Sequence, residues 1–480
     1  MESESKPFPL LRVTVIAVLV AAGSAAAATF FLSRGPGNTK DTTVGISLAE
    51  VAPPAPAPVA EPRSLVSTIS SVTMAPTAAA PSPSSRANDG APGRGPAMAS
   101  LEPEGPPVQG VTDTEIRFGI AAPFSGPAKE MGRQLKLGID TAFAAANDNG
   151  GVNGRQLKLL AADDGYEPTR TLAAMQTLYE SNQVFGFIDN YGSPTALVSV
   201  PYALERHAIF FGAFSGANSL RRDPPDRYVF NFRAGYAEEA DAVVRYLVKI
   251  RRIPPEQIAV LTQQDAYGDA GMDGVTKAIR ALRGGNATRI LRMSYNRNSV
   301  NLDEALTQLR QQKTAIKAVV MIATFRPAAK FIEKTRDAYP GMIYATISGV
   351  GSTGLADELK LLGPRFSDGV IVTQVVPAVD SYASVSLAYK KALAKYFPGE
   401  SPDYTSLESY LTANVLIEGL RRAGPQLNTD TLVDTLEGMH DLDLGLGPRV
   451  SFGLAEHQAL HKIWGTQLDQ NAQYHSLSLE

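Results

Sequence analysis

The chain has 480 residues, with 45 Lys and Arg, 48 Asp and Glu, and no cysteine. This near balance of charge leaves no basic surplus for binding nucleic acid, and a sequence without cysteine excludes disulfides, thiolate metal sites and lipid attachment through sulfur. No Phe, Trp or Tyr occurs between residues 33 and 109, where many of the 33 prolines also fall. Such a composition buries too little apolar surface to fold, so residues 33–110 are predicted to be a disordered linker. The rest, from about residue 111, suffices for two domains.

The N-terminus carries an uncharged run of 20 residues at positions 13–32. A helix of this length spans about 30 Å, the thickness of the hydrocarbon core of a bilayer. The run is either a transmembrane anchor with residues 1–12 in the cytoplasm, or a signal peptide cleaved after small residues near 25–28. The anchor is the favoured interpretation, because cleavage would leave a Phe-Phe-Leu sequence exposed on the new tail. Either interpretation sends the folded part across the membrane, anchored in the first case and free in the second.

From residue 111 onward, short apolar runs alternate with segments whose apolar residues recur at helical spacing. The apolar runs predict strands at 116–121, 157–162, 184–189, 209–213, 258–262, 318–322, 343–347 and 369–375. Helices are expected between most of these strands, as at 131–146, 271–282 and 328–339. Strands separated by helices indicate parallel sheets that are covered on both faces. Two successive runs of this kind predict an α/β fold with two doubly wound lobes.

Loops at the carboxyl ends of the strands are where ligands bind in such sheets. Here these loops span residues 123–126, 189–195, 213–218, 264–268 and 348–354. They contain Gly, Ser, Thr, Tyr and Phe but few acid–base groups. Hydroxyls and backbone N–H groups near helix N-termini suit a small anion, and aromatic side chains suit an apolar group. The loops therefore predict a cleft for a small molecule and no enzymatic activity.

Three local motifs suggest other chemistry, and each has a plainer interpretation. Residues 349–354 read G-x-G-x-x-G after a strand, but the next strand does not end in an acid for a ribose, so a tight turn is favoured over a dinucleotide site. His457 and His461 have metal-ligand spacing only on a helix, and their segment has the pattern of strand and turn. The pair Asp163 and Asp164 is more typical of a cap or turn than of acid–base catalysis. No cofactor and no metal is predicted.

Seven pieces of the sequence, taken in order, resemble one known family. They are PFSGPAKEMGRQLKLGID, NDNGGVNGRQLKLLAADD, NYGSPTA, FFGAFSGANSLR, FNFRAGYAEE, QDAYGDAGMDGV and DGVIVTQVVP. Together they resemble the leucine/isoleucine/valine-binding family of type I periplasmic substrate-binding proteins of ABC transporters. The resemblance implies two lobes joined by three crossovers, with residues 111–234 and 376–440 in lobe 1 and residues 235–375 and 441–480 in lobe 2. It also implies a small-molecule ligand and the permease subunits of an ABC transporter as partners.

The same resemblance implies which residues bind the ligand: Ser193, Ala213, Ser215, Tyr236, Tyr267 and Ser348. The first three would contact a ligand carboxylate, and the second tyrosine would close on the ligand from the second lobe. Ser348 stands where amino-acid binders of the family carry a carboxylate for the ligand ammonium. The expected ligand is a branched-chain amino acid, an amide or a related small carboxylate.

Alternatives stay open at this point. Ser193 is also compatible with an ordinary helix N-cap, and the two tyrosines with packing residues. The biological role is either delivery to an ABC importer or ligand sensing by a membrane-tethered module without direct transport.

Overall fold

The computed structural model describes residues 107–285 and 289–480. The predicted anchor at 13–32 and most of the predicted linker lie outside these residues. Within the described ranges no helix is both long and apolar enough to cross a bilayer. The described chain is packed from its first residues, because Val108 contacts the core and Gln109 Nε2 donates to the carbonyl oxygens of Tyr179 and Val184 at 3.1 and 3.0 Å.

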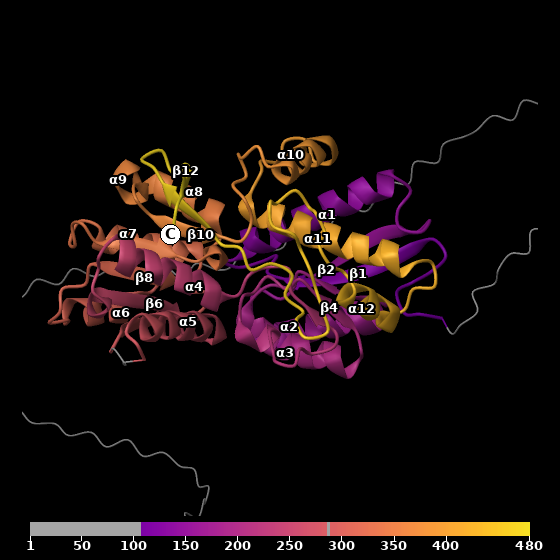
Figure 1. Cartoon of the computed structure of the whole chain (residues 1–480), viewed down its shortest axis with the longest axis horizontal. Helices are drawn as coiled ribbons and strands as arrows, with labels where there is room; N and C mark the ends of the chain where they lie inside the picture. Colours follow the sequence, from indigo (N-terminus) through magenta and orange to yellow (C-terminus); the bar gives the residue numbers. More distant parts are fainter. Residues whose placement is uncertain (1–106, 286–288) are drawn as a thin grey trace, which may run out of the picture. The chain divides into compact units, whose positions relative to one another are not determined.

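The first lobe is built on a five-stranded sheet of order β2-β1-β3-β4-β5 (Figure 1). The strands are β1 (Glu115–Ala122), β2 (Gln156–Asp163), β3 (Gly186–Ile188), β4 (Ile209–Phe211) and β5 (Val229–Phe230). All of them pair in parallel. The residues of β3, β4 and β5 are all buried, as expected for strands of a parallel sheet covered by helices on both faces.

Six helices belong to this lobe. They are α1 (Lys129–Asp148), α2 (Pro168–Gln176), α3 (Ser193–Glu205), α10 (Ser384–Tyr396), α11 (Tyr404–Ala423) and α12 (Thr429–Glu437). The last three come from the C-terminal part of the chain, and α11 packs tightly along α1 (Figure 1). Gly138 permits this approach, because a Cβ at that position would lie 2.2 Å from the backbone oxygen of Ser406.

The second lobe is built on a seven-stranded sheet of order β12-β11-β10-β9-β8-β6-β7. The strands are β6 (Ile258–Gln263), β7 (Leu291–Tyr295), β8 (Ala318–Ile322), β9 (Ile343–Thr346), β10 (Ile371–Gln374), β11 (Trp464–Leu468) and β12 (Tyr474–Leu477). The strands β6 to β10 pair in parallel, and β11 and β12 extend the sheet in antiparallel pairing. The helices are α4 (Tyr236–Arg245), α5 (Ala266–Leu282), α6 (Asp303–Arg310), α7 (Phe325–Thr335), α8 (Ser352–Leu362) and α9 (Pro364–Ser367). The predicted α/β class with parallel sheets is confirmed.

The chain passes between the two sheets three times: from β5 to α4, from β10 to α10, and ahead of β11. The first and third passages run side by side. Asn231 N donates to the carbonyl oxygen of His457 at 2.7 Å, and Ala459 N donates to the carbonyl oxygen of Asn231 at 2.8 Å. The carboxyl ends of the strands in both sheets therefore supply loops to one shared region next to these passages.

Candidate functional site

Two serines from the first lobe form the centre of the candidate site. Ser193 is the first residue of α3, and Gly192 before it has a positive φ of 98° that turns the chain into the helix. Ser215 follows β4, and its Oγ lies 2.8 Å from Ser193 Oγ. Both side chains are fully buried, and Ala213 lies beside them with its carbonyl oxygen accepting from Ser215 N. The structure thus places these three predicted residues together at the buried N-terminus of α3.

Two tyrosines bring the second lobe to the same place. The rings of Tyr236 and Tyr267, in the first turns of α4 and α5, have centroids 5.2 Å apart at an angle of 56°. A Cβ on Gly349 would lie 3.1 and 3.0 Å from their hydroxyl oxygens, so both phenols reach the loop after β9. Tyr236 N donates to Gly216 O at 2.8 Å, which ties this ring to the loop of Ser215. Burial raises the pKa of both tyrosines, so both are neutral donors at neutral pH.

Ser348 contacts a charged pair that sequence reasoning did not identify. Its N and Oγ donate to the two carboxylate oxygens of Glu239 at 2.8 and 3.0 Å. Arg233 Nη2 donates to Ser348 Oγ, and the same nitrogen lies 3.5 Å from Glu239. Thr373 Oγ1 also donates to Glu239, at 2.5 Å. A carboxylate is therefore present behind Ser348, but its oxygens are already occupied by donors of the protein.

The Arg233 guanidinium connects the two lobes. It lies on the first passage between the sheets, and its Nε is 3.4 Å from Glu408 of α11 in the first lobe. Arg233, Glu239 and Glu408 are all buried, and burial raises the pKa of Glu408 to about 7 against the opposing effect of Arg233. The sequence signal that could have found Arg233 is its place in the FNFRAGY stretch, where it stands among apolar residues that fill the core.

An aromatic wall continues the site in the first lobe. Tyr166 and Tyr191 meet edge to face with centroids 4.8 Å apart, and Tyr191 stacks on Phe214 at 5.9 Å. The guanidinium carbon of Arg233 lies 4.5 Å above the Phe214 ring, within the range of a cation–π contact. Gln263 of the second lobe donates from Nε2 to the Tyr166 hydroxyl at 2.9 Å. Tyr166 thus links these aromatic residues of the first lobe to the second lobe.

The chain matches the periplasmic binding protein family over residues 115–473. It belongs to this family. The resemblance found in the sequence is confirmed. One relative is the Leu/Ile/Val-binding protein BraC3 of Rhizobium johnstonii, which is 24% identical over 346 residues, covering 71% of this chain and 88% of the relative. The relatives are solute-binding proteins and not enzymes.

Solved structures agree with this membership. A possible leucine/isoleucine/valine-binding protein from Rhodopirellula baltica is 32% identical, with a TM-score of 0.72, and the match covers 78% of this chain and 99% of that one. A substrate-binding periplasmic protein from Ralstonia solanacearum is 25% identical, with a TM-score of 0.68 and coverage of 76% and 100%. The family implies a periplasmic location for this binding protein.

The lobes of this binding protein contact each other at the rim of the site. Asn298, after β7, donates from Nδ2 to the carbonyl oxygen of Gly165 at 3.1 Å and to Glu167 at 2.7 Å. Arg297 pairs with the same Glu167 at 2.8 Å and with Asp265 of its own lobe at 3.0 Å. The predicted site residues are all buried behind these contacts. Movement of the lobes apart would expose these residues, and hinge closure of this kind is known for two-lobed binding proteins.

The motifs that suggested other chemistry have structural partners. Asp163 accepts from Phe124 N, Ser125 N and Gly165 N. Burial opposes ionisation there, but these donors and the Ser125 hydroxyl hold its pKa at about 2, so Asp163 organises the turn after β2. His457 lies flat on Phe230, with ring centroids 3.9 Å apart.

His461 contacts Glu238 at 2.8 Å and lies in a segment without helical structure, so the two histidines do not face one point. The glycine-rich run opens with a short helical turn, Ser348–Val350. Gly351 then has a φ of 81°, and a Cβ there would meet Met131 Sδ at 2.5 Å. These glycines bring the second lobe onto α1.

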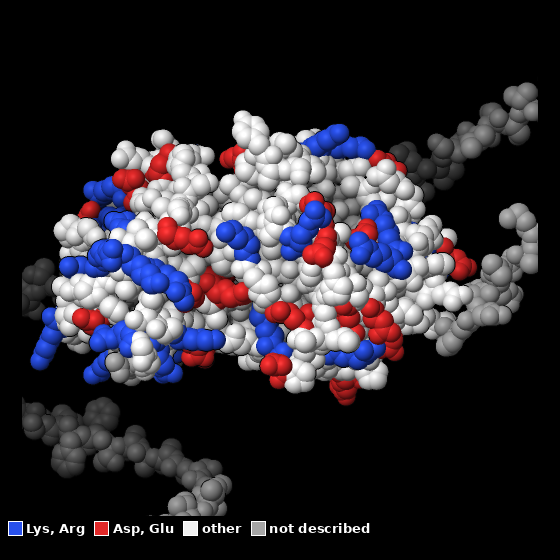
Figure 2. Space-filling view, viewed as in Figure 1, with Lys and Arg blue, Asp and Glu red and all other residues white. Residues whose placement is uncertain are grey.

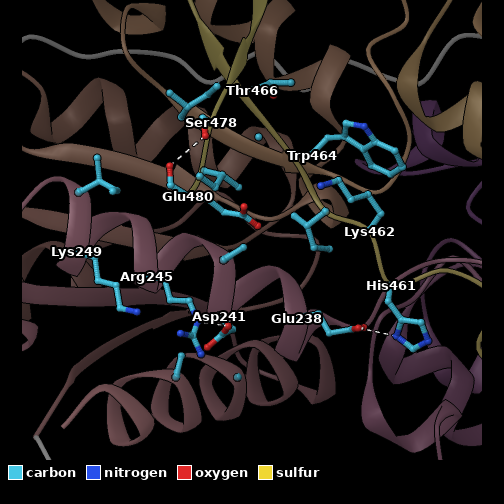
Figure 3. A pocket seen from close by; sticks show the side chains of 18 of the residues that line it. Glu238, Asp241, Arg245, Lys249, His461, Lys462, Trp464, Thr466, Ser478 and Glu480 are labelled. Atoms are coloured by element: carbon cyan, nitrogen blue, oxygen red, sulfur yellow. Dashed lines mark hydrogen bonds and ion pairs between the residues drawn. The ribbon is translucent and has the colours of Figure 1, made fainter. Parts of the chain in front are cut away.

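A solvent-open cavity of about 1220 Å³ lies elsewhere, between α4, α5 and the C-terminal strands (Figure 3). None of the predicted site residues lines it. Its wall carries Arg245, Lys249 and Lys462 together with Asp241 and the chain end (Figure 3). Lys and Arg side chains gather on the part of this face that carries α4 and α5 (Figure 2). The cavity is thus separate from the buried site between the lobes.

Proposed function

We propose that this protein binds a small polar ligand between its lobes and delivers it to the permease subunits of an ABC importer. The ligand class is a branched-chain amino acid, an amide or a related small carboxylate. One observation carries the proposal: Ser193 and Ser215 of one lobe and Tyr236 and Tyr267, at the start of the other, converge in one buried cluster. The name of the Rhizobium relative and the family membership support the same reading.

The carboxylate of the ligand binds at the N-terminus of α3. Ser193 and Ser215 hydroxyls and the free N–H groups of the first helical turn favour a carboxylate, because the helix dipole places partial positive charge there. The tyrosines then close on the body of the ligand from the second lobe. Binding energy gained across the cleft shifts the molecule towards its closed form.

We further propose that residues 13–32 hold the protein at the inner membrane with the lobes facing the periplasm. Membrane fractionation of cells that make the full chain tests this. Recovery in the membrane fraction supports the anchor. A soluble periplasmic form that begins near residue 28 would show a cleaved signal peptide instead.

The binding proposal is tested by a thermal-shift screen of the full chain against amino acids, amides and organic acids. A ligand at 100 times its dissociation constant adds about 2.7 kcal/mol to the stability of the folded state. Ser193→Ala is expected to weaken binding of the best hit roughly 10- to 150-fold, the effect of one hydrogen bond to a charged group. Ser181, an exposed residue at the end of the helical segment Thr177–Ser181, provides the control, since Ser181→Ala removes a hydroxyl outside the cluster. Equal affinity of Ser193→Ala and the unmodified protein would refute the site.

Delivery is tested separately from binding. Cells that lack this chain but keep the permease are expected to lose uptake of the best hit and to regain it with the intact gene. Intact uptake in the deleted strain would favour a ligand-sensing role for the tethered lobes.

A further inference from the structure

Arg233 carries a free donor into the buried cluster. Its side chain is 1% exposed, and its Nη1 has no hydrogen-bond partner among residues 107–285 and 289–480. The guanidinium carbon lies 4.5 Å over the Phe214 ring and 5.6 Å over the Tyr236 ring, and Nη2 is bound to Ser348. Residues of both lobes that line the site therefore surround it. A buried guanidinium N–H without an acceptor is costly, so the position favours a ligand oxygen there.

Negative charge near Arg233 is already committed to protein groups. Glu239 receives hydrogen bonds from Ser348 and Thr373 and pairs with Arg233, so its oxygens are not free to receive an ammonium. Asp189 is fully buried, and burial raises its pKa well above the ordinary value, which disfavours its charged form. An ammonium in the cluster would lose its water and meet the positive Arg233. Burial disfavours the charged form of Asp189, whose oxygens have no hydrogen-bond partner among the described residues, and of Glu408.

We propose that the ligand of this cleft is an organic acid without an ammonium group, and that Arg233 selects it by donating from Nη1 to a ligand oxygen. This inference rests on the proposed function of the same cleft. The ligand carboxylate meets the hydroxyls of Ser193 and Ser215, and a second oxygen, such as a 2-oxo group, meets Arg233. The rings of Tyr191 and Phe214 cover the apolar body.

Two sets of compounds with matched carbon skeletons test the class. The first set is 4-methyl-2-oxopentanoate, 4-methylpentanoate and leucine, and the second is phenylpyruvate, 3-phenylpropanoate and phenylalanine. Titration calorimetry on the full chain at pH 7 is expected to give, in at least one set, an affinity for the oxo acid at least about tenfold above that for the amino acid. An amino acid that binds more tightly than its oxo acid overturns the inference.

A wrong ligand class and a wrong site give different results. If leucine or phenylalanine binds best and Ser193→Ala weakens that binding, the cleft is the site and only the ligand class is wrong. If Ser193→Ala leaves every affinity unchanged, the proposed function itself is wrong. If no compound of either set binds, the organic-acid inference is refuted.

Variants of Arg233 test the selecting residue. Arg233→Met is expected to weaken binding of the best oxo acid about 30-fold and to change binding of the matched amino acid less than about threefold. Arg233→Lys keeps the positive charge but lacks the planar guanidinium with its fixed hydrogen-bond donors, so a loss of affinity smaller than that of Arg233→Met is expected. Arg245→Met, which removes an exposed arginine of the second lobe, is the control. Equal losses for oxo acid and amino acid in Arg233→Met would contradict selection by Arg233.

A second measurement holds even if Arg233→Met does not fold. An anion that engages Arg233 weakens the hold of this guanidinium on the Glu408 carboxylate, and Glu408 then binds a proton more readily. Binding of the oxo acid at pH 7 is therefore expected to take up as much as about half a proton, measured by calorimetry in buffers of different ionisation enthalpy. No uptake, or release of protons, would show that the ligand does not reach Arg233.

Discussion

Replacing Glu408 by Gln is expected to change how the stability of this protein depends on pH. Burial raises the pKa of Glu408 from its ordinary 4.5 to about 7. The folded form therefore keeps a proton that the unfolded chain has already released. The stabilisation from this proton is fully present below pH 4.5 and is lost as the pH rises through 7. A pKa difference of this size corresponds to about 3 kcal/mol of unfolding free energy.

Urea unfolding of the full chain, followed at pH 4.5 and pH 8, measures this effect. Glu408→Gln has no titrating group at this position. From pH 4.5 to pH 8 its unfolding free energy is therefore expected to rise by about 3 kcal/mol relative to that of the unmodified protein. Glu304→Gln, at an exposed position in α6, is the control and should follow the unmodified protein. If the unfolding free energies of Glu408→Gln and the unmodified protein differ by the same amount at both pH values, the raised pKa of Glu408 is refuted. If Glu408→Gln is less stable than the unmodified protein at pH 8, the ion pair with Arg233 contributes more than the burial of the carboxylate costs.

Three further changes test closure and folding. Asn298→Gly removes two hydrogen bonds between the lobes, and glycine suits the positive φ of 58° at this position. The dissociation rate of the best screening hit, measured by stopped flow, should therefore increase about 5- to 30-fold, and an unchanged rate would exclude Asn298 as a closure contact. Gly349→Ala places a Cβ against the Tyr267 hydroxyl and should weaken ligand binding measured by calorimetry. Gly453→Ala adds a Cβ that makes only an ordinary contact and should leave binding unchanged, so equal effects of the two variants would contradict the close contact between Gly349 and Tyr267. Deleting residues 1–106 should leave the urea midpoint unchanged, and loss of a cooperative transition would disprove that the lobes fold alone.

The sequence predicted most strands of both sheets. Eight strands were predicted from apolar runs, and all eight occur. Seven of them lie inside a sheet, where strands covered on both faces are apolar throughout, and the eighth, β2, is a partly exposed edge strand. Four strands were missed: β5, β7, β11 and β12. β5 has only two residues, and β11 and β12 form the partly exposed antiparallel end of the second sheet. A short or half-exposed strand gives no strong period in the sequence, and its pairing depends on neighbours far along the chain.

The site was predictable only in part, for a similar reason. The rule that loops after parallel strands carry ligands selected the loops at 189–195 and 213–218, and the family resemblance selected Ser193 and Ser215 within them. Arg233, Glu239 and Glu408 were missed, because their burial depends on one another. A charged side chain is normally exposed, so the sequence alone does not indicate a buried arginine. Arg233 can be buried here because the fold places Glu408 of α11 next to it.

In the proposed function, recognition and closure depend on different residues in the two lobes, and Arg233 contacts both lobes. Ser193 and Ser215 belong to the first lobe, so they can meet a ligand while the lobes are apart. Arg233 contacts Glu408 in that lobe and Ser348 in the other, so the full set of its contacts exists only when the lobes have closed. A ligand that satisfies Nη1 therefore stabilises the closed form over the open form. A ligand that reaches only the serines binds both forms alike and cannot shift their equilibrium.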